Sequence, residues 1–223
     1  MDKCSVNNLL DLGRTIAKDI FDDVIFPWEI LPNIKSFILK LGPTLDKNVF
    51  ENVQENVWIA RSANVYDTAY ISGPCIIDEG AEVRHCAFIR GSVIVGKKAV
   101  VGNSTELKNC LLFDGVQVPH YNYVGDSVLG YKAHMGAGSI TSNVKSDKTL
   151  VAVKDRETES VVHTELKKFG AVVGDNVEIG CNTVLCPGTI IGRESIIYPQ
   201  SCVRGVVNAG SIYKSPDHII KRI

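Results

Sequence analysis

An aliphatic or aromatic residue occupies every sixth position of one long stretch, from Ile59 to Phe113. The positions are Ile59, Val65, Ile71, Ile77, Val83, Ile89, Val95, Val101, Leu107 and Phe113, and a second, mostly small residue follows each of the first eight by four positions. Six residues advance about 240° around an α-helix and would scatter over its surface, whereas in a β-strand they stay on one face. A repeat this short cannot enclose a core alone. The pattern therefore predicts strands that stack in successive coils around a continuous apolar interior.

The remainder of the chain divides around this repeat. The next two sixth positions hold Pro119 and Gly125, which predicts a break in register and a loop over residues 119–125. A polar stretch with two β-prone runs predicts a hairpin excursion over residues 143–170. The repeat returns at Val173, Ile179, Leu185, Ile191, Ile197 and Val203. We therefore predict an N-terminal helical segment over residues 1–50, a β-helix over 51–210 and a C-terminal tail over 211–223.

Apolar residues near helical spacing within 8–25 and 32–41 predict two short helices in the N-terminal segment. One interpretation is a lid or a docking element for a partner. The other, which we prefer, is a cap on the open lower end of the coil stack, which would otherwise expose strand edges and apolar core.

Composition limits the function classes. The formal net charge of −1 offers no overall basic surface for nucleic acid. No window approaches eighteen apolar residues and the N-terminus is polar, so we expect no membrane partner and a cytoplasmic location. The seven cysteines include no Cys-x-x-Cys pair, so neither a disulfide framework nor a structural metal site is expected.

The six-residue pattern resembles that of hexapeptide-repeat proteins over about residues 52 to 210. In that family the chain winds as a single-stranded, left-handed parallel β-helix with eighteen residues per coil. The resemblance implies an all-β fold with a short helical cap. It also implies a homotrimer, because in such enzymes the cofactor lies between neighbouring subunits.

With eighteen residues per coil, Arg90 and Lys108 stand one above the other, about 4.8 Å apart. Like charges opposite each other on neighbouring strands are destabilising, so the pair predicts an anion between them. Asp126 falls a further eighteen residues on only if the break near Pro119 preserves the register. His120 lies in the predicted loop one coil away. Because a histidine titrates near neutral pH, His120 is a candidate general base.

Three segments carry a closer resemblance. Pro119–His120, Tyr123–Asp126 and Met135–Asn143 resemble the acetyltransferase half of the bifunctional N-acetylglucosamine-1-phosphate uridyltransferases, in an archaeal-like variant. That family uses acetyl-CoA as co-substrate and an amino-sugar 1-phosphate as acceptor. The uridyltransferase half has no counterpart in this sequence, so we do not expect that activity.

The resemblance also implies roles for individual residues. The catalytic group would comprise His120 as general base, with Glu106 and Asn143. The residues expected to bind the sugar phosphate are Arg90, Lys108, Tyr123, His134 and Lys168. Those expected to contact acetyl-CoA are Ala137, Asn143, Cys181, Pro199 and Lys214.

The sequence departs from the family pattern at three positions. His134 replaces an asparagine, Val144 a tyrosine and Cys181 a serine. These departures leave a second hypothesis open, namely a non-catalytic scaffold or sensor that keeps the sugar-phosphate site. A zinc enzyme of the carbonic anhydrase type is disfavoured, because Gly125 stands where a third ligand should join His85 and His120.

Overall fold

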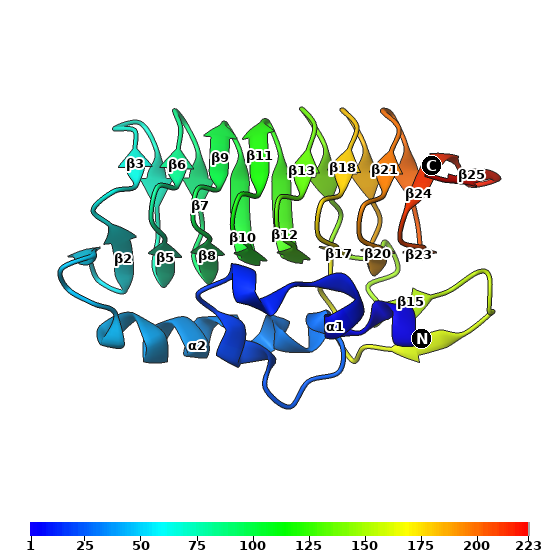
Figure 1. Cartoon of the computed structure of the whole chain (residues 1–223), viewed down its shortest axis with the longest axis horizontal. Coiled ribbons are helices and arrows are strands. Elements are labelled where there is room, and N and C mark those ends of the chain that lie inside the picture. The colour runs from blue at the N-terminus through cyan, green and yellow to red at the C-terminus, as the bar shows by residue number, and fades with distance from the viewer. Residues whose placement is uncertain (223) are drawn as a thin grey trace.

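The computed structural model describes residues 1–222 and consists of short parallel strands stacked in a row of coils (Figure 1). The prediction of an all-β, parallel β-helix is confirmed, and the architecture is consistent with the left-handed winding of hexapeptide-repeat proteins. In the described part of the chain, no helix is both long and apolar enough to cross a membrane. The coils form a three-sided prism, whose faces we treat separately.

The strands of each face pair in parallel from coil to coil. The first face, called the covered face below, contains β2 (Val57–Ala60), β5 (Cys75–Ile77), β8 (Val93–Val95), the second halves of β10 (Glu106–Leu112) and β12 (Tyr123–Leu129), β17 (Ala171–Val173), β20 (Thr189–Ile191) and β23 (Val206–Val207). The second face contains β3 (Asn64–Val65), β6 (Glu82–Val83), β9 (Val100–Asn103), β11 (Gln117–His120), β13 (His134–Met135), β18 (Glu178–Ile179), β21 (Ile196–Ile197) and β24 (Ser211–Ser215). The third, called the open face, contains β4 (Tyr70–Ile71), β7 (Phe88–Ile89), the first halves of β10 and β12, β14 (Ile140–Thr141), β19 (Val184–Leu185) and β22 (Cys202–Val203).

The coils are not uniformly eighteen residues long. Cys75 pairs with Val93, eighteen residues on, but Val93 pairs with Cys110, only seventeen residues further. The corner at Asn109 is one residue shorter than the corresponding corner of the preceding coil. The corner at Asp126, in the next coil, has the same shorter length. Both corner residues have positive φ, 47° and 49°, a conformation that Asn and Asp tolerate better than most residues.

The shortened corners correct two predictions. Leu112, not Phe113, is the residue aligned with Val95 in the interior. The predicted loop 119–125 is wrong, because β11 and β12 keep their ladder pairing throughout this region. The register break is absorbed at the corners, so only the two residues between β11 and β12 lie outside strands.

The N-terminal segment differs from the predicted pair of helices. It consists of η1 (Asp2–Cys4), α1 (Val6–Leu9), η2 (Leu12–Arg14), η3 (Lys18–Phe21), η4 (Pro27–Asn33), α2 (Ile34–Leu41) and η5 (Gly42–Thr44). The second predicted helix is confirmed by α2, but a helix through 8–25 is wrong. Side chains there bond to nearby backbone instead, as Asp11 accepts from Gly13 N and Thr15 from Ala17 N, and such local bonds compete with helix formation.

The segment lies along the side of the stack and does not cap its end (Figure 1). Helix α2 packs on β8 and β10, and η4 packs on β12. Beneath the segment and the hairpin runs a stripe of outward-facing apolar side chains, all fully buried: Ile76, Ile94, Leu111, Val128, Val172 and Ile190. Burying such side chains contributes about 1.5 to 3 kcal/mol each, so the apolar stripe fixes the segment to this face. The prediction of an end cap is therefore wrong.

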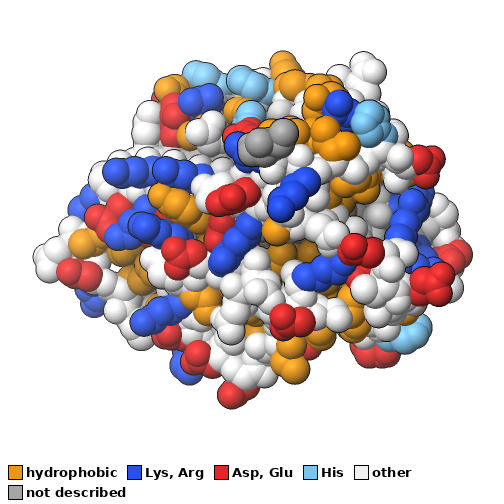
Figure 2. All heavy atoms as spheres, turned by 45° about the vertical axis from the view of Figure 1, so that its right-hand side comes forward, with side chains coloured by type: hydrophobic (Ala, Val, Ile, Leu, Met, Phe, Trp, Pro, Cys, Tyr) orange, Lys and Arg blue, Asp and Glu red, His pale blue; other side chains and the backbone are white. Residues whose placement is uncertain are grey.

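Antiparallel strands occupy the two ends of the stack. At the first end β1 (Phe50–Gln54) pairs with β2, and at the other β25 (His218–Lys221) pairs with β24. Because β24 also continues the parallel ladder from β21, the predicted tail 211–223 is, in its described part, a further strand of the coil and a return strand. Figure 2 brings this end forward and shows apolar side chains interspersed with charged ones. Within 143–170, β15 (Ala152–Lys154) and β16 (Val161–His163) form an antiparallel hairpin.

Candidate active site

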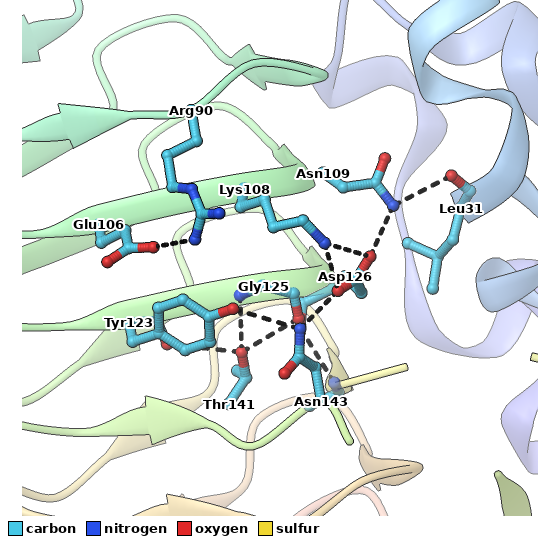
Figure 3. A network of polar contacts seen from close by, with 12 residues as sticks. Leu31, Arg90, Glu106, Lys108, Asn109, Tyr123, Gly125, Asp126, Thr141 and Asn143 are labelled. Carbon is cyan, nitrogen blue, oxygen red and sulfur yellow. Dashed lines mark hydrogen bonds and ion pairs between the residues drawn. The ribbon is translucent and has the colours of Figure 1, made fainter. Parts of the chain in front are cut away.

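Four of the proposed site residues project from neighbouring strands of the open face. Arg90 follows β7, Glu106 and Lys108 belong to β10, and Tyr123 begins β12, so parallel stacking brings their side chains together (Figure 3). Arg90 Nη1 lies 2.7 Å from Glu106 Oε1, and Lys108 Nζ lies 3.1 Å from an oxygen of Asp126. Each cation thus has a carboxylate partner, and the four formal charges cancel.

This pairing corrects the argument that two stacked cations require an anion between them. The two positions do stack, since Arg90 N donates to Leu107 O. However, the shortened corner moves Asp126 opposite Asn109, from where its carboxylate reaches back to Lys108. The protein itself therefore supplies the negative charges. Arg90 and Lys108 are therefore neutralised without a bound phosphate, which would be an additional partner for both.

Asn143 joins this cluster from the base of the hairpin excursion. Its Nδ2 donates to Tyr123 Oη at 3.2 Å and to Asp126 Oδ2 at 2.5 Å. Burial raises the pKa of Tyr123, and the charges of Asp126 and Glu106 raise it further. The phenol therefore stays protonated at neutral pH, and because its oxygen accepts from Asn143, its own proton remains for a ligand.

His120 is exposed at the end of β11, at the corner between the second and open faces. The buried side chain of Asn122 builds this corner. Its oxygen accepts from His120 N at 3.0 Å, and its Nδ2 donates to Gly136 O and Ser139 O. The carboxylate of Glu106, which the resemblance implies could orient the base, pairs instead with Arg90. The histidine is thus held by its backbone at the edge of the open face.

Three of the proposed cofactor contacts stack above His120 along the same corner. Gly138 N donates to His120 O, Asn182 N to Ala137 O, and Gln200 N to Cys181 O, at 3.0, 2.8 and 2.8 Å. These bonds place His120, Ala137, Cys181 and Pro199 on successive coils, one residue per coil. At about 4.8 Å per coil the column spans about 14 Å. Lys214 lies further along, with its Nζ 5.5 Å from the ring centroid of Tyr198.

The two remaining predicted residues are not in the cluster. His134 projects from the second face, with Nδ1 2.7 Å from Glu178, and lines a cavity of about 680 Å³ with Lys97 and Lys132. Lys168 is exposed, but it precedes the buried Phe169, whose N donates to Asn143 O at 2.9 Å. Lys168 is therefore adjacent to the cluster through the backbone, whereas His134 faces elsewhere.

Two residues of the network were not predicted as site residues. Asp126 enters the sequence prediction only as a charge in an eighteen-residue register, and Asn109 has no predicted role. Their signal in the sequence is the spacing between interior residues, which falls from six to five between Leu107 and Leu112 and again between Val124 and Leu129. Within residues 1–222, no three His, Cys, Asp or Glu side chains are placed to hold a metal ion.

Family comparisons agree with the repeat architecture. Residues 170–205 match the family described as bacterial transferase hexapeptide (six repeats), and residues 71–163 match the family described as the GMPPB C-terminal domain. The first match falls on the second run of the six-residue pattern, in agreement with the predicted resemblance to hexapeptide-repeat proteins. A solved hexapeptide transferase family protein from Anaplasma phagocytophilum is 17% identical, with a TM-score of 0.42 over 75% of this chain and 80% of that one.

Curated relatives narrow the resemblance. The chain is 33% identical over 205 residues to the bifunctional protein GlmU of Methanococcus vannielii, covering 91% of this chain and 49% of the relative. It is 31% identical over 247 residues to the bifunctional sugar-1-phosphate nucleotidylyltransferase/acetyltransferase of Sulfurisphaera tokodaii, covering 96% and 57%. The predicted resemblance to this bifunctional group is confirmed. The chain spans about half the length of these curated relatives.

Proposed function

We propose that this chain is an acetyl-CoA-dependent N-acetyltransferase that acts on an amino-sugar 1-phosphate of the glucosamine 1-phosphate type. The observation that carries the proposal is the array on the open face. Arg90, Lys108, Tyr123 and Asn143 form one cluster, and His120 stands at the adjoining corner. The name of the Sulfurisphaera tokodaii relative, which includes a sugar 1-phosphate and an acetyltransferase, supports the same assignment.

In this proposal the cluster binds the sugar phosphate. The guanidinium of Arg90 has five N–H donors and the ammonium of Lys108 has three, so each can keep its carboxylate and still bind a phosphate oxygen. Lys168 would add a third cation from the base of the hairpin. The phenol of Tyr123 would donate a hydrogen bond to a sugar hydroxyl. His134, which projects from the second face, is not needed for this arrangement.

The chemical step needs a base, because an ammonium group cannot attack a thioester. His120 would accept one proton from the sugar amine as its nitrogen attacks the acetyl carbonyl carbon. The C–S bond then breaks, and the coenzyme A thiolate leaves and takes up the second proton, which the nitrogen loses as the amide forms. Asn143, whose two amide protons bond Tyr123 and Asp126, would lie next to the acetyl group and hold these two partners in place beside it.

The donor would lie along the corner above His120. Ala137, Cys181 and Pro199 would line its extended arm, and Lys214 would meet its phosphates further along the stack. The column of about 14 Å suits a long and narrow ligand. We expect this reaction in the cytoplasm.

We further propose a homotrimer in which a neighbouring copy covers the open face and completes the cofactor groove. Tyr70, Phe88 and Tyr121 are all exposed near the cluster, at 64%, 40% and 66%. Mass photometry of the active protein tests this proposal. A species of monomer mass that retains full activity would contradict it.

The function is tested by following thiol release from acetyl-CoA with glucosamine 1-phosphate, then with a panel of amino-sugar phosphates. N-acetylglucosamine 1-phosphate is the matched control, because its amine is already acylated. Amine-dependent release supports the proposal. If calorimetry shows that a sugar phosphate binds but no thiol is released, the chain is a sugar-phosphate scaffold instead.

A further inference from the structure

Asp126 is the most heavily hydrogen-bonded side chain of the open-face cluster, although it is only 4% exposed. Its carboxylate accepts from Lys108 Nζ at 3.1 Å, from Asn109 Nδ2 at 2.9 Å and from Asn143 Nδ2 at 2.5 Å (Figure 3). Three donors from two parts of the chain, β10 and the base of the hairpin excursion, thus converge on one carboxylate. A carboxylate that is buried and so fully bonded orients its neighbours strongly, because each lost bond leaves a polar group unpaired.

The shortened corners create this arrangement. In the preceding coil two corner residues, Gly91 and Ser92, separate Arg90 from Val93. In the next coil a single corner residue, Asn109, separates Lys108 from Cys110. With one residue removed, Asn109 and Asp126 occupy the same corner of neighbouring coils, and the side chain of Asp126 lies within reach of the open-face residues Lys108 and Asn143 (Figure 3). Asn109 also donates to Leu31 O at 3.2 Å, so the network reaches the N-terminal segment.

The two functional partners of Asp126 belong to opposite ends of the proposed reaction. Lys108 would hold the phosphate of the acceptor, whereas Asn143 would meet the acetyl group of the donor. We propose that Asp126 is a positioning residue that fixes Lys108 and Asn143 relative to each other and so aligns the two substrates. This inference rests on the proposed acetyltransferase function.

The alternative role, a purely electrostatic one, has a different signature. A negative charge beside Lys108 opposes phosphate binding, so its removal should tighten binding and leave the rate constant unchanged. Loss of positioning instead lowers kcat, because small displacements of reacting groups are costly. The split between KM and kcat therefore distinguishes the two roles.

The test compares Asp126→Asn with Asp175→Asn. Asp175 is a matched control, because it is also buried and accepts from Asp11 N and Tyr131 N, both at 2.8 Å, far from the cluster. We expect Asp126→Asn to lower kcat about 10- to 100-fold, with KM for the sugar phosphate changed less than about threefold. Asp175→Asn should leave kcat unchanged. Unchanged kcat in Asp126→Asn would overturn the inference.

Two further measurements cover the remaining outcomes. If Asp126→Asn does not fold, Asn109→Ala decides: a fall in kcat of at least about threefold supports positioning, and an unchanged kcat overturns it. If the wild type transfers no acetyl group, the proposed function fails separately. The side-chain amide resonance of Asn143, followed by NMR, then reports its position directly. It should shift and exchange faster in Asp126→Asn but not in Asp175→Asn, and an unshifted resonance would overturn the inference.

Discussion

The covered face and the open face are built from the same strands, yet their outward side chains are opposite in character. On the covered face, Ile94 and Leu111 point outward and are fully buried by the N-terminal segment. On the open face, the same coils present Arg90, Glu106 and Lys108, which are partly exposed and paired by charge. The interior repeat is identical beneath both. The difference shows that the inward positions specify the β-helix, while the outward positions specify what each face meets.

This difference also assigns separate roles to the two faces. An apolar stripe covered by the chain's own segment is occupied and cannot bind a substrate. The open face keeps polar groups at fixed spacing, and the network of Asp126 and Asn109 connects it to the N-terminal segment through Leu31 O. The covered face thus provides stability, and the open face carries the proposed chemistry.

The largest expected effect concerns the base at the edge of the open face. His120→Ala should lower kcat by about 10²- to 10⁴-fold, because a positioned general base contributes that much to proton removal. Binding of glucosamine 1-phosphate, measured by calorimetry, should change little. The kcat/KM of the wild type should rise with pH as the general base loses its proton, and the variant should lack this rise.

Retention of more than about a third of the wild-type kcat would contradict the general-base role, since base catalysis contributes far more than that. The comparison of the two faces would then need revision. Activity would depend on positioning by the cluster alone or on another base, with Glu106 the first to test.

The next effect concerns the covered face. Ile94→Ala should reduce the free energy of unfolding by about 2 to 5 kcal/mol, because it removes buried methyl groups and leaves a cavity under the N-terminal segment. Ile25→Ala is the matched control, since Ile25 is 65% exposed, and it should change stability by less than about 0.5 kcal/mol. Denaturant unfolding at one protein concentration gives both values. Equal losses would mean that the apolar stripe does not hold the segment.

A smaller effect separates the two cations of the open face. Arg90→Ala and Lys108→Ala should each raise KM for the sugar phosphate by a factor equivalent to roughly 1.5 to 3 kcal/mol, the usual worth of a charge-assisted hydrogen bond. Their effects on the stability of the unliganded protein should differ. The Arg90–Glu106 pair is 45% and 33% exposed and should contribute little to stability, whereas Lys108→Ala removes a partner from the buried Asp126. Equal stability losses would contradict this distinction.

Much of the fold could be predicted from the sequence, and the misses share one cause. The interior apolar residues identified the β-helix, because they recur every six residues regardless of what packs on the outer surface of the coils. The outward stripe was overlooked, although runs such as Cys75-Ile76-Ile77 are apolar at three consecutive positions where other strands alternate. That run was the available signal for a covered face. The end cap was therefore predicted in place of a segment along the side.

The site was predicted in part for a similar reason. Coil spacing singled out Arg90 and Lys108, and family resemblance added Tyr123 and Asn143. The structure brings these four residues together. Their carboxylate partners depend on tertiary register, and an unbroken eighteen-residue count placed Asp126 one position away from where it lies. A one-residue deletion at a corner leaves the interior residues apolar. Its only signal in the sequence is therefore a spacing of five between interior residues, in place of six.

The smallest expected effect concerns a carboxyl group buried beside the N-terminal segment. Asp78 is fully buried, and its Oδ2 has no hydrogen-bond partner within the described residues. Burial raises the pKa of Asp78, although a hydrogen bond from Glu79 N and the charge of Lys97 partly oppose the rise. The folded protein therefore holds this proton more tightly than the unfolded chain does. The stability that this proton contributes is fully present at pH values below the ordinary aspartate pKa of about 3.9. It is lost as the pH rises through the raised pKa of Asp78 in the folded protein.

Asp78→Asn removes this titration, so the stability advantage of the variant over the wild type should grow as the pH rises from 4 to 7. Denaturant unfolding at several pH values measures that difference directly. The difference isolates Asp78, because Asp175, whose pKa burial also raises, titrates in both proteins. Asp155→Asn should show the opposite trend. Burial alone would raise the pKa of Asp155, but hydrogen bonds from Lys3 and Thr158 hold it below its usual value. Parallel curves for wild type and Asp78→Asn would mean that water reaches Asp78, and that the N-terminal segment covers this part of the prism less tightly than the apolar stripe beside it.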